Sequence, residues 1–459
     1  MQIILRLKVV AVLAFTVAGC GFVQPTPDLE RLYSTARGNV DQPPVIIVPG
    51  LMGSKLASSE DGEIWIGSLW DLAFSEYRNA ALDIDPETLL PDPGDVRVTG
   101  ITGKFAGRNF YQPIIQMLED VGGFRRAEAG KSIDPSGRYY YIFAYDWRLD
   151  NVESVRGLSR LIEQIRQDHG DPDMKVDIIA HSMGGMIARY YLRYGTEDVT
   201  EDNDFPVNYH GAQRVRRIVI LGTPNMGSVK SLQAFISGRQ IGLRTIPPEV
   251  MMTFPSFYQL FPHPLTDWLI DMRGRSFDID PFDISTWKRF NWGLFDQARR
   301  RKIMERFDDP EEGRARLALL ERYFEKHIER GRRFMWSLTV NMDRQPWQLV
   351  VFGGDCNLTT ARGLVEAVDG RFDLRMRPEE IVDPVAGIDY ERLMLEPGDG
   401  LVTKTSLLAR QTLDPFVPRH KWSDFPVDYP LFLCEDHSQL TNNAFFQNNL
   451  LHFLLSRDR

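Results

Sequence analysis

The chain is short of cysteine, has no excess of basic charge, and carries no apolar run long enough to cross a membrane as a helix. Its 459 residues include three cysteines, and 54 Lys and Arg stand against 63 Asp and Glu, for a formal net charge of −9. This acidic balance argues against nucleic acid as a partner. No cluster of His, Asp and Cys has metal-ligand spacing, so neither a metal nor an organic cofactor is expected.

The N-terminus predicts export. An apolar run from Val9 to Gly19 follows two basic residues and is shorter than the roughly 20 residues that a spanning helix needs. It ends at Cys20 in a Val-Ala-Gly-Cys sequence that resembles the lipobox of bacterial lipoproteins. The resemblance implies a signal peptide over 1–19, a lipid on Cys20 that anchors the protein to a membrane, and a tether over 20–41. An ordinary secretory signal is the alternative.

The expected compartment is the bacterial cell envelope. Gly21 follows the cysteine where an Asp would retain a lipoprotein at the inner membrane, so the outer membrane is favoured. With lipid on Cys20, the other two cysteines, Cys356 and Cys434, form an even pair in an oxidising space and are a candidate disulfide. Two unpaired core cysteines are the alternative.

Strand-like and helix-like segments alternate along the chain. The strand-like segments are short and rich in β-branched or aromatic residues, and between two of them a helical stripe is formed by Val155, Leu158, Leu161, Ile162 and Ile165. This rhythm predicts a mostly parallel sheet with helices on both faces, in a single domain over 42–459. The predicted strands are Val45–Val48, Tyr139–Tyr145, Val176–Ala180, Arg217–Leu221 and Gln348–Phe352.

Two long insertions interrupt that alternation, at about 55–108 and about 229–334. Structureless loops of such length are rare, so a folded lid and a folded cap are expected. Trp65 and Trp70 in the first insertion belong either to a core or to a membrane-facing lid. The second insertion contains the aromatic segment Phe254–Pro262, which is expected to offer a surface for acyl chains.

Ser182 is the predicted nucleophile. It follows the apolar run that begins at Val176, and small residues flank it two positions away on each side, at Ala180 and Gly184. A sharp strand–turn–helix elbow that exposes a serine hydroxyl needs this spacing. The helix that follows is expected from Met183 to about Tyr194. The alternative is a serine that only caps this helix.

An acid and a histidine are expected further along the chain. Asp399 lies between two glycines in a turn, where its carboxylate can be presented freely. The alternative is an Asp-Gly turn that has no role in chemistry. His437 lies in a short polar loop before a helical segment, three residues after Cys434, so a disulfide at that cysteine would hold the loop in place. His420 is the reserve candidate, and His452 is expected to pack in an apolar helix.

These motifs together resemble the family of lecithin–cholesterol acyltransferase-like enzymes, which includes lysosomal phospholipase A2 and phospholipid–diacylglycerol acyltransferases. The matching residues occur in the family's order and are Pro44–Ser54, Tyr145–Arg148, Ala180–Gly185, Leu221–Ser228, Gly398–Val402 and His437. The resemblance implies an α/β-hydrolase fold, with Ser182 as nucleophile, Asp399 as acid and His437 as base. It also implies that the backbone N–H groups of Leu51 and Met183 bind the oxyanion. Asp146 and Arg148 are expected to form a structural ion pair.

The predicted function is that of a serine-dependent lipid acyl hydrolase or O-acyltransferase, which acts on phospholipid or related esters through an acyl-enzyme. The expected partners are a lipid substrate and the membrane that holds the anchor. A triacylglycerol lipase or a glycolipid-anchor deacylase on the same fold is the first alternative. A non-catalytic surface lipoprotein is the second.

Overall fold

The computed structural model describes residues 26–36, 42–343, 347–413, 416 and 425–456. The predicted signal peptide, Cys20 and His420 lie outside the described residues. Within those ranges no helix has both the length and the apolar character needed to cross a membrane.

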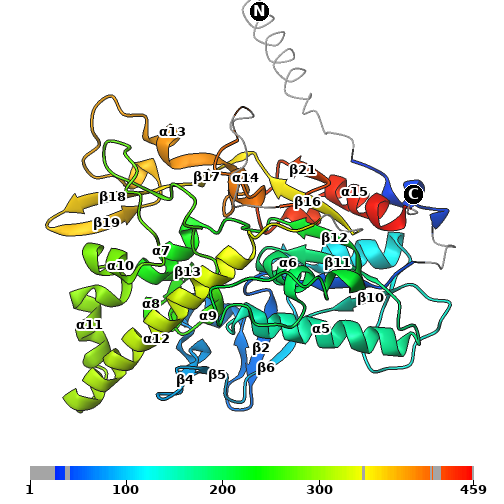
Figure 1. The fold of residues 1–459 in the computed structure, drawn as a ribbon, viewed down its shortest axis with the longest axis horizontal. Helices are drawn as coiled ribbons and strands as arrows, with labels where there is room; N and C mark the ends of the chain where they lie inside the picture. The colour runs from blue at the N-terminus through cyan, green and yellow to red at the C-terminus, as the bar shows by residue number, and fades with distance from the viewer. Residues whose placement is uncertain (1–25, 37–41, 344–346, 414–415, 417–424, 457–459) are drawn as a thin grey trace, which may run out of the picture.

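A seven-stranded parallel sheet forms the centre of the molecule (Figure 1). The predicted strands fill its five contiguous inner positions. In spatial order the strands are β21 (Tyr429–Leu433), β16 (Gln348–Gly354), β12 (Val215–Leu221), β11 (Val176–His181), β1 (Val45–Val48), β10 (Tyr139–Ile142) and β9 (Arg125–Arg126).

Helices cover both faces of this sheet because successive strand residues point to opposite sides. Ile46 and Val48 of β1 pack in the cluster that contains α5 (Asn151–Asp168) and α6 (Met183–Tyr194). Val45 and Ile47 pack in the other cluster, with α4 (Gln112–Gln116) and α15 (Ala444–Leu455). Strands buried on both faces read as continuous apolar runs, and this confirms the predicted layers.

One predicted strand is too long. β10 ends at Ile142, three residues before the predicted end at Tyr145. The N–H of Phe143 still donates to the Ile47 carbonyl over 2.9 Å, and then the chain leaves the sheet. Beyond that point Tyr145 donates its N–H to Ser54 Oγ at 3.0 Å and its hydroxyl to the Pro49 carbonyl at 2.9 Å. These contacts fix the loop after β1.

The first insertion is folded and separates its two tryptophans. Trp65 is 2% exposed and donates Nε1–H to the Met52 carbonyl at 2.8 Å, whereas Trp70 is 72% exposed on α3. One side chain is therefore core and the other faces solvent. The elements are β2 (Ser54–Ser58), β3 (Gly62–Trp65), α3 (Leu69–Phe74), β4 (Asp83–Ile84), β5 (Pro91–Asp92), β6 (Arg97–Ile101), β7 (Lys104–Phe105) and β8 (Arg108–Asn109), of which β3, β2 and β6 form one antiparallel sheet.

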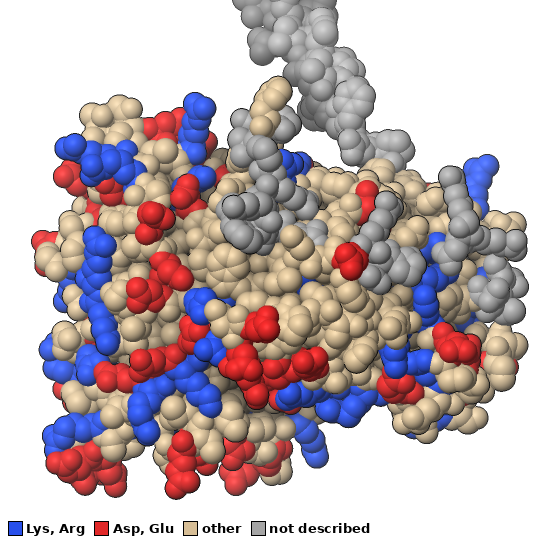
Figure 2. Space-filling view, in the orientation of Figure 1, with Lys and Arg blue, Asp and Glu red and all other residues tan. Residues whose placement is uncertain are grey.

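The second insertion, between β12 and β16, is mainly helical. Figure 1 shows its long helix α12 lying obliquely beside α9 and α11, and Figure 2 shows acidic and basic side chains interspersed over this side of the molecule. Its elements are α7 (Val229–Ser237), β13 (Arg239–Ile241), β14 (Arg244–Ile246), α8 (Pro248–Met251), α9 (Pro255–Tyr258), β15 (Leu269–Ile270), α10 (Ile284–Phe290), α11 (Gln297–Met304) and α12 (Pro310–Ser337).

The aromatic segment around α9 does not offer the acyl-chain surface that was expected of it. Phe254, Phe257, Tyr258 and Phe261 are all fully buried. Tyr258 packs edge-on against Phe324 of α12, so these rings hold the cap together. Only Leu260 of this segment reaches the pocket described below.

The region after β16 carries the remaining predicted site residues. β17 (Asn357–Thr360) pairs antiparallel with β20 (Leu395–Gly398), and β18 (Gly363–Val368) pairs with β15 and β19 (Arg371–Arg375). The short helices α13 (Tyr390–Met394) and α14 (Lys404–Leu407) flank β20. His452, expected to pack, is instead exposed on α15, because this helix buries Leu450, Leu451, Phe453 and Leu454 around it.

Candidate active site

Ser182 sits at a strained turn between β11 and α6. Its backbone adopts φ 54° and ψ −125°, a conformation that is costly for a residue with a Cβ. The small neighbours are required by space: a Cβ on Gly184 would lie 2.6 Å from the Pro49 carbonyl oxygen, and one on Gly185 would lie 2.0 Å from Thr223 Oγ1. The helix runs from Met183 to Tyr194 as predicted.

The structure brings Ser182, His437 and Asp399 together at the carboxyl ends of the strands. The Nε2 atom of His437 lies 3.0 Å from Ser182 Oγ, and its Nδ1 atom lies 2.8 Å from Asp399 Oδ2. The three residues are far apart in the sequence, and each follows a different strand: β11, β20 and β21. An imidazole held between a carboxylate and a hydroxyl can take the hydroxyl proton.

Backbone groups fix the carboxylate and the histidine loop. Asp399 Oδ1 accepts N–H bonds from Leu401 at 3.0 Å and Val402 at 2.7 Å. The N–H of His437 donates to the Asp399 carbonyl at 2.9 Å. Burial opposes ionisation of Asp399, but the hydrogen bonds from His437 and from these N–H groups hold the pKa of its carboxyl below the ordinary value. The carboxylate is therefore charged at neutral pH.

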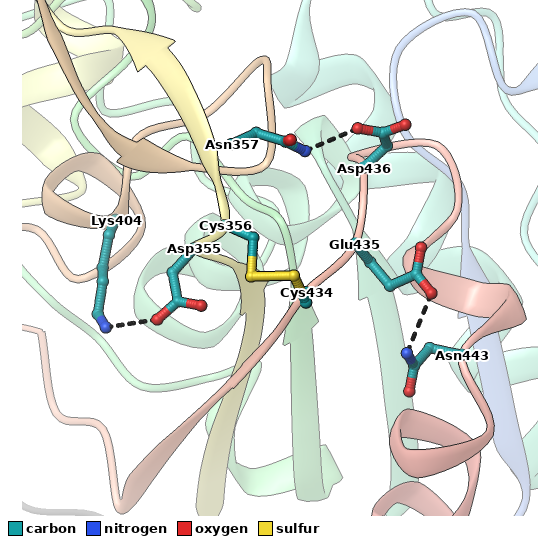
Figure 3. Close-up of a disulfide and its surroundings, with 8 residues drawn as sticks. All are labelled: Asp355, Cys356, Asn357, Lys404, Cys434, Glu435, Asp436 and Asn443. Carbon is teal, nitrogen blue, oxygen red and sulfur yellow. Dashed lines mark hydrogen bonds and ion pairs between the residues drawn. A yellow bond between two sulfur atoms is a disulfide. The ribbon is translucent and has the colours of Figure 1, made fainter. Parts of the chain in front are cut away.

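A disulfide joins the segments that carry the acid and the histidine (Figure 3). Cys356 lies between β16 and β17, whose partner β20 leads into Asp399, and Cys434 directly follows β21. The Asn357 amide donates to Asp436 at 2.7 Å, and Figure 3 shows this pair beside the bridge. The sulfur–sulfur bond therefore ties the β17–β20 pair to the loop of His437.

Two backbone N–H groups close to Ser182 in the chain or in the pocket lack a hydrogen-bond partner among the described residues. The Pro49–Gly50 turn carries Leu51, and Met183 opens α6 directly after the serine. Within the described residues the N–H groups of Leu51 and Met183 donate to no backbone oxygen. Buried N–H groups are rarely left unsatisfied, so this pair is suited to donate hydrogen bonds to a negatively charged oxygen.

A largely apolar pocket opens over Ser182 and His437. Both insertions contribute to it, the first through β3 and the second through β13. One cation also lines it: Arg239, which forms no ion pair with a carboxylate of the described residues. Burial lowers the pKa of this guanidinium below its ordinary value. The apolar lining consists of Leu51, Met52, Trp65, Ile66, Phe110, Ile241, Leu260, Leu401 and Val402.

Two residues of the site have no clear signal in the sequence. His181 precedes the serine, and its ring lies 4.9 Å from that of His437, centroid to centroid. Tyr111 lies 2.8 Å from His181 Nδ1 through its hydroxyl. A histidine beside the nucleophile is too close in sequence to serve as its base, and a tyrosine 70 residues earlier belongs to no motif that spacing can detect. Asp146 and Arg148 do form the expected ion pair, at 2.7 Å.

Comparison with known proteins points to one family. A model of the lecithin:cholesterol acyltransferase family matches residues 103–283. Over this stretch the chain is similar to the lecithin:cholesterol acyltransferase family. The matched stretch contains Ser182, Tyr111 and His181, and it ends before Asp399 and His437.

The similar curated proteins are each called lysosomal phospholipase A and acyltransferase. The protein from Bos taurus is 25% identical over 225 residues, which cover 43% of this chain and 51% of the relative. The protein from Homo sapiens is 27% identical over 241 residues, which cover 45% and 52%. The chain thus matches about half the length of these relatives.

A solved structure supports the fold over nearly the whole chain. The crystal structure of the Tle4–Tli4 complex covers 91% of this chain and 98% of its own at a TM-score of 0.52, with 16% sequence identity. This identity is low enough that the likeness concerns the fold alone. Together with the parallel sheet and its covering helices, it confirms the predicted α/β-hydrolase class.

Proposed function

We propose that this protein is a serine-dependent lipid acyl hydrolase or O-acyltransferase that acts on phospholipid or related acyl esters. The observation that carries the proposal is the hydrogen-bonded line from Asp399 through His437 to Ser182, at 2.8 Å and 3.0 Å, at the floor of an apolar pocket. The similarity to proteins named for phospholipase A and acyltransferase activity supports the lipid ester as substrate.

The reaction proceeds through an acyl-enzyme. Ser182 Oγ attacks the ester carbonyl while its proton passes to His437 Nε2, and Asp399 holds the imidazole by its Nδ1–H. The carbonyl oxygen takes up negative charge opposite the N–H groups of Leu51 and Met183. His437 then gives its proton to the departing alcohol. Water or a second alcohol repeats the steps in reverse and releases the acid or a new ester.

Arg239 favours a phospholipid over a triacylglycerol. Its guanidinium lines the same pocket as Ser182 and has no carboxylate partner in the described part of the chain. Transfer of an unpaired cation into a pocket is costly, and the phosphate of a lipid headgroup would offset that cost, whereas a neutral ester would not. We therefore expect Arg239→Gln to weaken hydrolysis of phospholipid more than that of triacylglycerol.

Two measurements test the proposal. A fluorophosphonate probe is expected to label wild type and to leave Ser182→Ala unlabelled. Acyl-labelled phospholipid with and without a long-chain alcohol then separates the two reactions, because a hydrolase releases only fatty acid and a transferase also forms the alcohol ester. Equal labelling of wild type and Ser182→Ala, or labelling of neither, would contradict the proposal and leave a binding lipoprotein as the better interpretation.

A further inference from the structure

An uninterrupted line of hydrogen bonds crosses the site beside the reacting side chains. The N–H of Gly50 donates to the Tyr111 hydroxyl over 2.8 Å, and that hydroxyl lies 2.8 Å from His181 Nδ1. The Nε2 atom of His181 lies 3.2 Å from the main-chain carbonyl of His437. The line therefore runs from the turn that carries Leu51 to the backbone of the histidine.

Chemistry fixes the direction of each bond. A carbonyl can only accept, so Nε2 of His181 carries the hydrogen that it donates to the His437 carbonyl. In the neutral ring Nδ1 is then unprotonated and accepts from the Tyr111 hydroxyl, which in turn accepts from the N–H of Gly50. Each link permits one arrangement of protons only, so the whole line specifies a single tautomer of His181.

His181 is also kept neutral. Burial, and secondarily the nearby His437, lowers the pKa of His181 to about 3, and burial raises the pKa of the Tyr111 hydroxyl. Neutrality matters because the two imidazole rings lie 4.9 Å apart. A cation at His181 would repel the imidazolium that forms on His437 when Ser182 gives up its proton.

The backbone of His437 has its own supports on both sides. Its N–H donates to the Asp399 carbonyl at 2.9 Å, and its carbonyl accepts from His181 at 3.2 Å. The residues before Tyr111 contact the same loop, because Thr441 Oγ1 donates to the Phe110 carbonyl. The N–H of Gly50 is held by the Tyr111 hydroxyl at the opposite end of the line. A Cβ on Gly50 would lie 2.6 Å from Ser182 Cβ, so this turn has almost no room to shift.

We propose that Tyr111 and His181 are positioning residues that hold the His437 backbone and the Gly50–Leu51 turn in one fixed relation around Ser182. This inference rests on the proposed serine mechanism. Neither side chain takes up a proton from the substrate or contacts the attacking oxygen. Their effect is on the alignment of the base with the oxyanion donors, and a displacement of about 1 Å in such an alignment can cost about 100-fold in rate.

Two substitutions at position 181 separate the two halves of the line. Gln places an amide N–H near the position of Nε2 and can still donate to the His437 carbonyl, whereas Asn can reach only the Tyr111 side. We expect His181→Gln to retain kcat within about 10-fold of wild type and His181→Asn to lose about 100-fold, with KM for a short-chain ester nearly unchanged in both. Tyr111→Phe is expected to fall between them.

Tyr194→Phe is the matched control. It also removes a buried tyrosine hydroxyl, which donates to the Ser337 carbonyl at 2.7 Å, but it lies outside this line of bonds. A thermal melt of every variant measures any general loss of stability. We expect Tyr194→Phe to lower stability as much as Tyr111→Phe does, with kcat at the wild-type value.

The outcomes distinguish the two proposals. If wild type reacts with a fluorophosphonate and Ser182→Ala does not, the serine mechanism stands, and the order Gln above Asn at position 181 supports the positioning line. Two results would contradict the positioning role of Tyr111 and His181 and leave the serine mechanism standing. One is equal kcat values for His181→Gln and His181→Asn, and the other is a kcat of Tyr111→Phe that matches that of Tyr194→Phe. A wild type that resembles Ser182→Ala overturns both.

Discussion

At the scale of single residues, Asp399 illustrates how a buried carboxylate remains charged. Two backbone N–H groups and the Nδ1–H of His437 donate to it, and the loop that carries it closes on itself through the Asp399 N–H and the Val402 carbonyl at 3.1 Å. In the proposed mechanism the carboxylate thereby fixes one tautomer of His437 and stabilises the imidazolium that forms there.

Asp399→Asn should therefore lower kcat by about 10³–10⁴-fold while leaving the fold intact. An amide in this position would favour the wrong tautomer of His437, whose Nε2 could then no longer accept the proton of Ser182. Steady-state hydrolysis of a short-chain ester measures the effect. Asp436→Asn, in the same loop as the histidine, is the control and should stay within about 2-fold of wild type.

His181 predicts a pH dependence of stability. Its pKa in the folded protein is about 3, below the ordinary value of 6.5, so the unfolded chain binds a proton that the folded chain does not. Stability contributed by the neutral ring is present above about pH 6.5 and falls as pH drops below it, by about 2 kcal/mol between about pH 7 and pH 5.

Urea unfolding at these two pH values checks this expectation. His181→Asn should lose less free energy of unfolding than wild type on going from about pH 7 to pH 5, because it has no imidazole to protonate. His327, whose pKa burial also lowers, to about 4, remains in both proteins and cancels in the comparison. An identical pH dependence in the two proteins would show that His181 is not buried as a neutral ring.

At the scale of elements, the disulfide controls where β17 and the histidine loop lie. Replacement of Cys356 and Cys434 by Ser is expected to lower the free energy of unfolding by about 2–4 kcal/mol, because the bridge closes a long loop with a sequence separation of 78. Activity should fall as well, since both Asp399 and His437 are reached from the bridged segments. Denaturant unfolding and ester hydrolysis measure the two effects, and an unchanged kcat would show that the loop is held without the bridge.

The elements that the sequence predicts well are those whose bounds are set by local sequence patterns. β1 and α6 appear at their predicted bounds, because a doubly buried strand is apolar throughout and the helix begins after the elbow and ends at Gly195. β10 was predicted too long because aromatic residues continue past its end. Those residues bind the loop after β1, a contact that no local pattern contains.

The residues of the site likewise divide into those with a signal in the sequence and those without one. Ser182 has a local signature in its strand, turn and helix, and Asp399 and His437 follow from chain order and family motifs. Tyr111 and His181 act through bonds to Gly50 and to the main chain of His437, and main-chain partners leave no mark in a single sequence. The aromatic segment around Phe257 was assigned to substrate for a similar reason: apolarity alone does not distinguish a core from a pocket wall.

At the scale of the whole molecule, exposed apolar side chains lie on α3 and on the hairpin of β13 and β14. Trp70 and Phe74 on α3 are exposed, with their tilted rings 4.6 Å apart, and Leu243, at the turn between β13 and β14, is 80% exposed. The guanidinium Nε–H of Arg244 donates to the Ala73 carbonyl at 3.4 Å and so links α3 to this hairpin. Arg239 and Ile241 of β13 line the pocket, so the exposed side chains belong to elements that are linked to its wall.

We propose that Trp70, Phe74 and Leu243 bring the entrance to a lipid surface. Tryptophan and phenylalanine favour the boundary between headgroups and acyl chains, and an ester inside a bilayer can reach Ser182 only if the pocket opens towards it. The combined change Trp70→Ala, Phe74→Ala and Leu243→Ala is expected to reduce hydrolysis of phospholipid vesicles by about 10-fold or more through weaker binding. Hydrolysis of a soluble short-chain ester should be unchanged, because the reacting groups are untouched.

Val382→Ala, at another exposed apolar position that does not line the pocket, provides the control and should affect neither substrate. Equal loss on vesicles and on the soluble ester would place the effect on the pocket itself and contradict a role in docking.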